Sequence, residues 1–422
     1  MLTESAGAIW GIALLATGGV VVRPWRLPEA VWAVLGALAL VGFGLLPWTD
    51  ALHGVQRGLD VYLFLIGMML LAELARQEGL FDWLAALAVE HARGSPQRLF
   101  MLVYLVGTLV TVFLSNDATA VVLTPAVYAA TRAAGATPLP YLFVCAFIAN
   151  AASFVLPISN PANLVIFDGR MPPLLAWLAQ FAVPSLAAIV VTYAMLRLTQ
   201  RKALQDEKIA HEVRRPALGH GGRMAAYGIG AVAVVLLGCS ALDLPLGLPT
   251  FVCGGVTAAV VLVMNRQSPW PVLRHISWSV IPLVAGLFVL VEGLNRTGAT
   301  AALSEVLKEA VAASAGGAAW GAGIAVAIAC NLMNNLPAGL IAGSVVAADQ
   351  APAHVTGAVL IGVDLGPNLS VTGSLATILW LVALRREGEG VDAWRFLRLG
   401  LVIMPPALIA AIGAMLALGV SS

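Results

Sequence analysis

Four clusters of amide and hydroxyl side chains interrupt otherwise apolar stretches of this chain. They are Ser115-Asn116-Asp117, Asn150 with Ser159-Asn160 and Asn163, Asn334-Asn335, and Asp364 with Asn368, Thr372 and Ser374. Amides and hydroxyls both donate and accept hydrogen bonds, so clusters brought together would form a pocket for a small polar solute. The carboxyl groups of Asp117 and Asp364 are rarer in such surroundings, and each is a candidate for carrying a proton or an ion.

The composition around these clusters is that of a membrane protein. Of 422 residues, 60% are hydrophobic and 11% are charged, with 23 Lys and Arg against 22 Asp and Glu. Soluble domains carry about 25% charged residues, and a water-soluble protein of this size could not bury so much apolar surface. This excludes a soluble enzyme, a nucleic-acid-binding protein and a disordered scaffold. It predicts an all-α polytopic membrane protein.

Ten apolar stretches are long enough to be transmembrane spans. They are 6–22, 30–47, 59–75, 139–167, 174–196, 224–242, 247–264, 276–293, 353–384 and 395–419. Two further stretches, 98–133 and 318–349, are interrupted midway by Ser115-Asn116-Asp117 and Asn334-Asn335, which predicts re-entrant hairpins with polar tips. Amphipathic segments at 80–93 and 299–312 precede the hairpins and are expected to lie along the interface.

The same order of elements occurs twice, which predicts an inverted repeat. Residues 1–197 form the first half and 223–422 the second, each with one hairpin and five spans. One span in each half is a broken helix, at about 139–167 and 353–384. The polar segment 198–222 is the predicted cytoplasmic linker. With this map, 19 of the 23 Lys and Arg fall on the cytoplasmic side, which predicts extracytoplasmic termini.

The chain carries no sequence signature of an enzyme or a cofactor site. It has no GxxxxGK[ST], HExxH or GxSxG motif, and its four cysteines show no CxxC spacing. We therefore expect that the protein is not an enzyme and that it binds no cofactor and no metal ion. Inverted repeats with interrupted helices are typical of secondary transporters, whose substrate site lies near the midplane where the repeats meet.

Three motifs resemble those of the arsenical pump membrane proteins, the ArsB-type arsenite permeases of the ion transporter superfamily. They are Ser115-Asn116-Asp117-Ala118, Asn334-Asn335-Leu336-Pro337, and Gly362-Val363-Asp364-Leu365-Gly366-Pro367-Asn368 leading to Gly373-Ser374-Leu375-Ala376-Thr377. The resemblance runs end to end. It implies export of arsenite and antimonite across the inner (plasma) membrane in exchange for protons. It also implies an elevator-like transport domain, and it allows a soluble ATPase subunit and a homodimer as partners. Members of that family usually have twelve spans and cytoplasmic termini. This is an alternative to the ten spans, two hairpins and extracytoplasmic termini predicted above.

The polar clusters supply the expected binding and coupling residues. Arsenite near neutral pH is mainly an uncharged trihydroxide, which suits amide and hydroxyl partners. The expected substrate-binding residues are Ser115, Asn116, Asn150, Ser159, Asn160, Asn163, Asn334, Asn335, Asn368, Thr372 and Ser374. We expect Asp117 to be the proton carrier. Asp364 is the alternative, or it orients the broken helix.

A second interpretation on the same scaffold is a sodium/proton antiporter or a sodium-coupled anion carrier. In that case Asp117 and carbonyl groups at the tips would bind Na⁺. A dicarboxylate substrate is the least attractive version, because neither hairpin-tip cluster contains a Lys or Arg that could pair with its charge.

Overall fold

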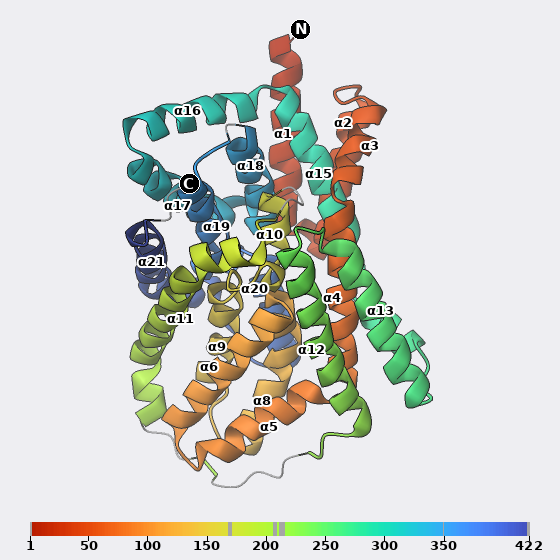
Figure 1. The fold of residues 1–422 in the computed structure, drawn as a ribbon, viewed down its shortest axis with the longest axis vertical. Coiled ribbons are helices and arrows are strands. Elements are labelled where there is room, and N and C mark those ends of the chain that lie inside the picture. The colour runs from red at the N-terminus through yellow and green to blue at the C-terminus, as the bar shows by residue number, and fades with distance from the viewer. Residues whose placement is uncertain (1, 168–170, 206–208, 211–215, 349, 420–422) are drawn as a thin grey trace.

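The computed structural model describes residues 2–167, 171–205, 209–210, 216–348 and 350–419. The described part of the chain is helical without strands, which confirms the predicted all-α membrane fold. Its first half contains α1 (Leu2–Val22), α2 (Glu29–Gly42), α3 (Trp48–Arg57), α4 (Leu59–Gln77), α5 (Leu80–Ala92), α6 (Pro96–Phe113), α7 (Asn116–Ala118), α8 (Thr124–Ala133), α9 (Leu139–Ala151), α10 (Pro161–Ile166) and α11 (Leu174–Gln205). Its second half contains α12 (His220–Ala241), α13 (Gly247–Met264), α14 (Trp270–His275), α15 (Val280–Arg296), α16 (Ala299–Ala313), α17 (Ala315–Met333), α18 (Asn335–Ala348), α19 (Ala353–Leu365), α20 (Leu375–Arg386) and α21 (Ala393–Ala417) (Figure 1).

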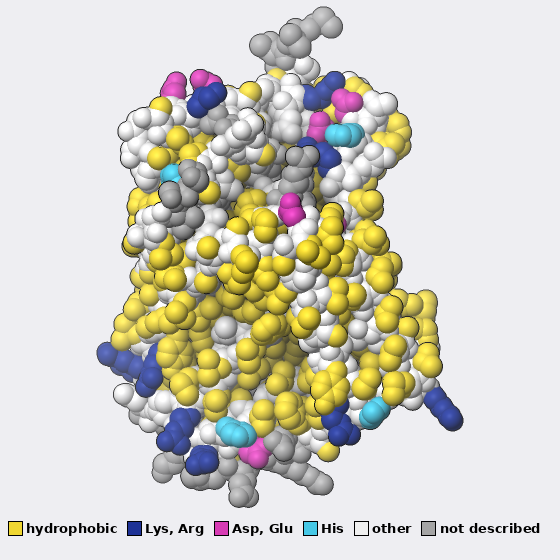
Figure 2. Space-filling model, viewed as in Figure 1, with side chains coloured by type: hydrophobic (Ala, Val, Ile, Leu, Met, Phe, Trp, Pro, Cys, Tyr) yellow, Lys and Arg dark blue, Asp and Glu magenta, His cyan; other side chains and the backbone are white. Residues whose placement is uncertain are grey.

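Seven helices in the described residues are long and apolar enough to cross a membrane, and up to nine if each of two bent helix pairs counts as one span. The bent pairs are α3 with α4, at 45°, and α15 with α16, at 73°. Figure 2 shows a broad apolar band across the middle of the face in view, with charged side chains gathered toward both ends. This is the surface expected of a protein whose middle faces lipid.

Both interrupted stretches fold back on themselves. The first reverses direction between α6 and α7, where the Ser115 hydroxyl accepts a hydrogen bond from the Ala118 N–H, at 3.1 Å. The second reverses at Asn334, whose φ is 75°. Both arms of the first hairpin, α6 and α8, contact α5, and both arms of the second, α17 and α18, contact α16. Each hairpin therefore returns to the end it started from, as the sequence predicts.

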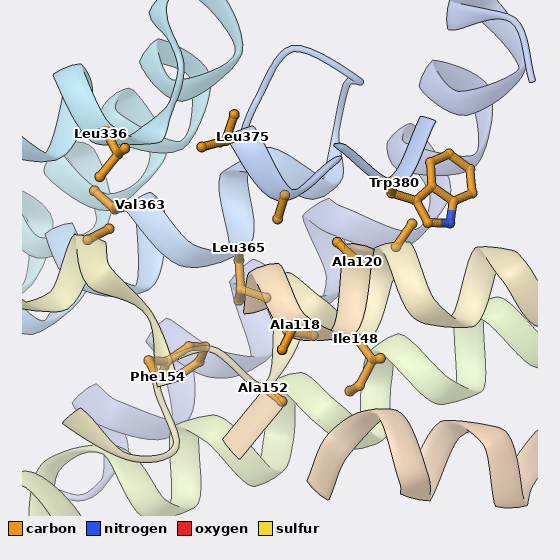
Figure 3. Close-up of a cluster of buried hydrophobic side chains, with 14 of the residues drawn as sticks. Ala118, Ala120, Ile148, Ala152, Phe154, Leu336, Val363, Leu365, Leu375 and Trp380 are labelled. Atoms are coloured by element: carbon orange, nitrogen blue, oxygen red, sulfur yellow. The ribbon is translucent and has the colours of Figure 1, made fainter. Parts of the chain in front are cut away.

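Two spans are broken in their middle, also as predicted. A short loop with a single 3₁₀ turn separates α9 from α10, and another separates α19 from α20. Figure 3 shows how apolar side chains from both hairpin tips and both broken spans pack together, among them Ala118, Phe154, Leu336 and Leu365. Because this packing fixes the broken ends against one another, polar groups in the loops are held in place.

The two interfacial helices differ in how they pack. Figure 1 places α16 across the upper end of the molecule and α5 across the lower end. Helix α5 buries seven residues, among them Phe81 and Val89, whereas α16 buries none of its described residues. An apolar groove of about 720 Å³, lined by Leu303, Val306 and Leu307 among others, lies between α16 and the second hairpin.

The structure corrects two boundaries and adds two helices. The predicted linker 198–222 is shorter, because α11 continues to Gln205 and α12 already begins at His220. Lys, Arg, Gln and Ala are good helix formers, so α11 extends beyond its apolar part. Helices α3 and α14 precede α4 and α15 at matching places and were not predicted, because both are too short and polar to stand out by hydropathy.

Candidate transport site

The hairpin tips and the broken spans meet at a small cavity. Its polar lining consists of Asn116, Asp117, Asn160, Asn335 and Ser374. The first half contributes Asn116 and Asp117 from its hairpin tip and Asn160 from its broken span. The second half contributes Asn335 from its tip and Ser374 from its broken span. The cavity measures about 20 Å³, which is enough for one group the size of a water molecule.

Local backbone geometry positions each of these side chains. Asn116 accepts a hydrogen bond from the Asp117 N–H at 2.9 Å, and Asn160 accepts one from the Ala162 N–H at 3.0 Å. Ser374 caps α20 by accepting from the Thr377 N–H at 3.1 Å. In each case the side chain stands at the first turn of a helix, where backbone N–H groups lack helical partners.

A larger cavity of about 70 Å³ extends from Asp117 and Ser115 to Glu73 and His275. Glu73 lies near the end of α4, where its carboxylate accepts from Arg76 at 2.5 and 2.7 Å and from Gln77 at 2.8 Å. The His275 side chain is 57% exposed and lies 3.8 Å from the same carboxylate. Asp117 thus borders both cavities, and Glu73 lies beside the exposed His275 in the larger one.

Asp364 is placed differently, behind the wall of the site. It is fully buried and accepts hydrogen bonds through Oδ1 from Ser153, at 2.7 Å, and from Asn160. Its Oδ2 has no hydrogen-bond partner among the described residues. Because the Asn160 amide lines the small cavity, Asp364 orients a wall residue without bordering either cavity itself.

Asn150 connects the broken spans of the two halves. Its amide nitrogen donates to Asn368 at 3.0 Å and to Thr377 at 3.3 Å, and its oxygen accepts from Ser374 at 3.3 Å. Asn368 in turn donates to the Phe147 carbonyl at 3.1 Å. These buried bonds satisfy groups that would otherwise be costly in an apolar interior.

A second network holds the loop after α19. The amide of Asn331 donates to the carbonyls of Ala327 and Gly366, at 2.7 and 2.9 Å. Its oxygen accepts from Ser370 at 2.7 Å, and its own carbonyl accepts from Thr372 at 3.0 Å. This network fixes the loop that leads to Ser374.

The predicted site residues therefore fall into two groups. Those that border a cavity are Ser115, Asn116, Asp117, Asn160, Asn335 and Ser374. Those that do not are Asn150, Ser159, Asn163, Asn334, Asn368, Thr372 and Asp364. Ser159 and Asn163 bond backbone carbonyls, at 3.1 Å to Val112 and 3.0 Å to Ser153, and Asn334 approaches the Thr372 carbonyl at 3.5 Å.

Sequence reasoning missed Glu73, His275 and Asn331 as contributors. Asn331 lies three residues before Asn334-Asn335, which was a usable signal. Nothing local in the sequence indicates that the ends of α4 and α14 meet at one opening, because that contact depends on the tertiary fold.

The chemistry of the two cavities is uncharged apart from carboxyl groups and a histidine. Neither is lined by a Lys or Arg among the described residues. The described part of the chain also holds no group of three or more His, Cys, Asp and Glu able to bind a metal ion. The amide, hydroxyl and carboxyl groups that line the cavities can donate and accept hydrogen bonds.

Comparison with known proteins places the chain in a family. Residues 12–363 match the family described as citrate transporter, CitMHS. The chain belongs to this family. It is 29% identical over 97% of its length to an arsenical pump membrane protein of Escherichia coli, covering 97% of that protein. It is 30% identical to the one of strain K12, over 83% of this chain and 84% of that protein. The resemblance to the arsenical pump membrane proteins is thereby confirmed.

A solved structure is similar in fold. The YdaH transporter of Alcanivorax borkumensis matches with a TM-score of 0.57 and 17% identity, over 93% of this chain and 97% of that one. At that identity the match concerns the fold alone. The chain is a multi-pass membrane transporter of the CitMHS family, and its homologues are named as pumps and transporters.

Proposed function

We propose that this transporter exports arsenite, and antimonite with it, from the cytoplasm across the plasma membrane in exchange for protons. The observation that carries the proposal is the cavity between the tips, whose polar lining is three amides, a hydroxyl and one carboxyl group. A neutral trihydroxide offers three O–H groups to accepting oxygens and three oxygens to amide donors. The names of the arsenical pump relatives agree with this substrate.

A citrate-like substrate fits the same site poorly. A tricarboxylate buried without cationic partners would carry a large desolvation cost, and neither cavity offers Lys or Arg among the residues described. The family description names citrate, and the lining of this site argues for a different substrate. Sodium-coupled transport has no comparable observation in its favour.

Coupling would use Asp117, because it borders both cavities. Deprotonated, its carboxylate accepts a hydrogen bond from arsenite when the site communicates with the cytoplasm. Protonation from the outside removes the negative charge and leaves a weaker acceptor, which weakens the binding of arsenite. The chemistry moves only a proton, and no covalent bond to arsenic is formed.

Everted membrane vesicles test this proposal directly. An imposed pH gradient, acid inside, should drive arsenite accumulation that is indifferent to sodium, while citrate is not accumulated. Arsenite uptake that requires a sodium gradient, or citrate uptake on the pH gradient, would contradict it.

A further inference from the structure

A polar pocket lies apart from the transport site, where the end of α11 meets the beginning of α21. It measures about 500 Å³. Helix α11 contributes Thr199 and Gln200, α21 contributes Trp394, Arg395 and Arg398, and Phe143 comes from the first turns of α9. None of these residues borders the cavities between the hairpin tips.

The pocket carries positive charge that the described carboxylates do not neutralise. Arg395 and Arg398 form no ion pair with any described Asp or Glu. Asp392 also lines the pocket, and its carboxylate caps α21 by accepting from the Arg395 N–H at 2.6 Å. One carboxylate against two guanidinium groups leaves a positive site, which suits an anion.

Aromatic rings hold both guanidinium groups. Arg395 lies 5.7 Å from the centre of the Phe143 ring, and Arg398 lies 5.0 Å from the centre of the Trp394 ring. Stacking of this kind orders the planar side chain while its N–H groups stay available for an oxyanion. The two donors are therefore arranged before a ligand arrives.

The position of the pocket indicates which anion it meets. Helices α11 and α21 are both long and apolar enough to span a membrane, and the pocket lies at their ends. Trp394 is 57% exposed, as is usual for tryptophan at the level of lipid headgroups. The neighbouring Leu198, Leu401 and Val402 are exposed apolar side chains along which acyl chains can lie.

We propose that this pocket binds the phosphate of an anionic phospholipid, with Arg395 and Arg398 as its ligands. Basic pockets between transmembrane helices are known to take such headgroups. Since α11 and α21 follow the broken spans in the two halves, the bound lipid would join the ends of repeat-related helices at the membrane surface.

Native mass spectrometry of the full chain in detergent tests the site. Phosphatidylglycerol should be retained in preference to phosphatidylcholine. Arg395→Gln and Arg398→Gln should each weaken retention about 5-fold, and the double variant about 30-fold. The double variant Arg395→Lys/Arg398→Lys keeps the charge but not the planar stacking, and should lose part of the affinity.

The matched control is Arg385→Gln/Arg386→Gln, which removes two exposed arginines from the end of α20 outside the pocket. It should retain the lipid as the parent chain does, at equal membrane abundance. Equal loss in both double variants would assign the effect to general surface charge and overturn the proposal. So would unchanged retention in Arg395→Gln/Arg398→Gln. Displacement of the lipid by inorganic phosphate at comparable concentration would identify a free-phosphate site instead and equally overturn it.

Discussion

Asn116 and Asn335 approach one cavity from the two hairpin tips, and both amides are buried. Replacing either by Ala removes a hydrogen-bonding partner of the proposed substrate, which costs about 1–3 kcal/mol. We therefore expect Asn116→Ala and Asn335→Ala to weaken apparent arsenite affinity about 5- to 150-fold in vesicle uptake. Asn265→Ala, at the end of α13 and outside both cavities, is the control and should transport normally. Unchanged uptake by both tip variants would remove these residues from the site.

The half-buried Asp117 and the buried Asp364 should respond differently to the same change. Asp117→Asn keeps the shape of the side chain but cannot titrate, so uptake driven by a pH gradient should be lost while arsenite exchange persists. Asp364→Asn retains the Oδ1 that accepts from Ser153 and Asn160, and replaces only the oxygen that lacks a described partner. It should still accumulate arsenite on a pH gradient. If Asp364→Asn loses coupling and Asp117→Asn keeps it, their proposed roles are reversed.

At the level of elements, the close crossing of α18 and α10 joins the second hairpin to the first broken span. A Cβ added at Gly343 would lie 2.7 Å from the Ile166 carbonyl oxygen, whereas one at Gly339 would lie 3.6 Å from the nearest Ile166 atom. Overpacking of this kind costs about 1–3 kcal/mol. Gly343→Ala should lower the melting temperature in detergent, and Gly339→Ala on the same helix should not. Equal melting temperatures for the two variants would mean that the crossing relaxes freely.

Hydropathy and polar interruptions were enough to predict most elements, because a membrane span must be long and apolar and a break must carry polar groups. The hairpins and the broken spans follow from that rule. The interfacial helices follow from their amphipathic pattern. Helix α3 was not predicted, because the mean hydropathy of its ten amphipathic residues is as low as that of a loop. The sequence also could not predict which of the polar residues border the cavity. Asn160 and Asn163 have the same chemistry three residues apart, yet only Asn160 borders the cavity.

For the whole molecule, the charge distribution predicts that the ends of α11 and α5 face the cytoplasm. In a chain whose four native cysteines are replaced by Ser, a cysteine at Gln205 should react with an impermeant thiol reagent only in everted vesicles. One at Thr49, exposed in the first turn of α3, should react only in intact cells. Both side chains are exposed in the structure, so access is governed by topology. Labelling of both positions in everted vesicles would contradict this orientation and favour the one usual in the arsenical pump family.

The hydrogen bonds between the broken spans also have a consequence for how the protein is made. Asn160 and Ser153 donate to a carboxylate that follows them by 204 and 211 residues, and Asn150 donates to Asn368, which follows by 218. During synthesis these groups of the first half must therefore wait in the membrane without their second-half partners until most of the second half has been translated, although Ser153 also has the Asn150 carbonyl at 2.7 Å. A nascent chain in that condition depends on the insertion machinery or on water for its polar loops. Premature termination before residue 364 would leave a product that membrane quality control can recognise by its unpaired polar groups.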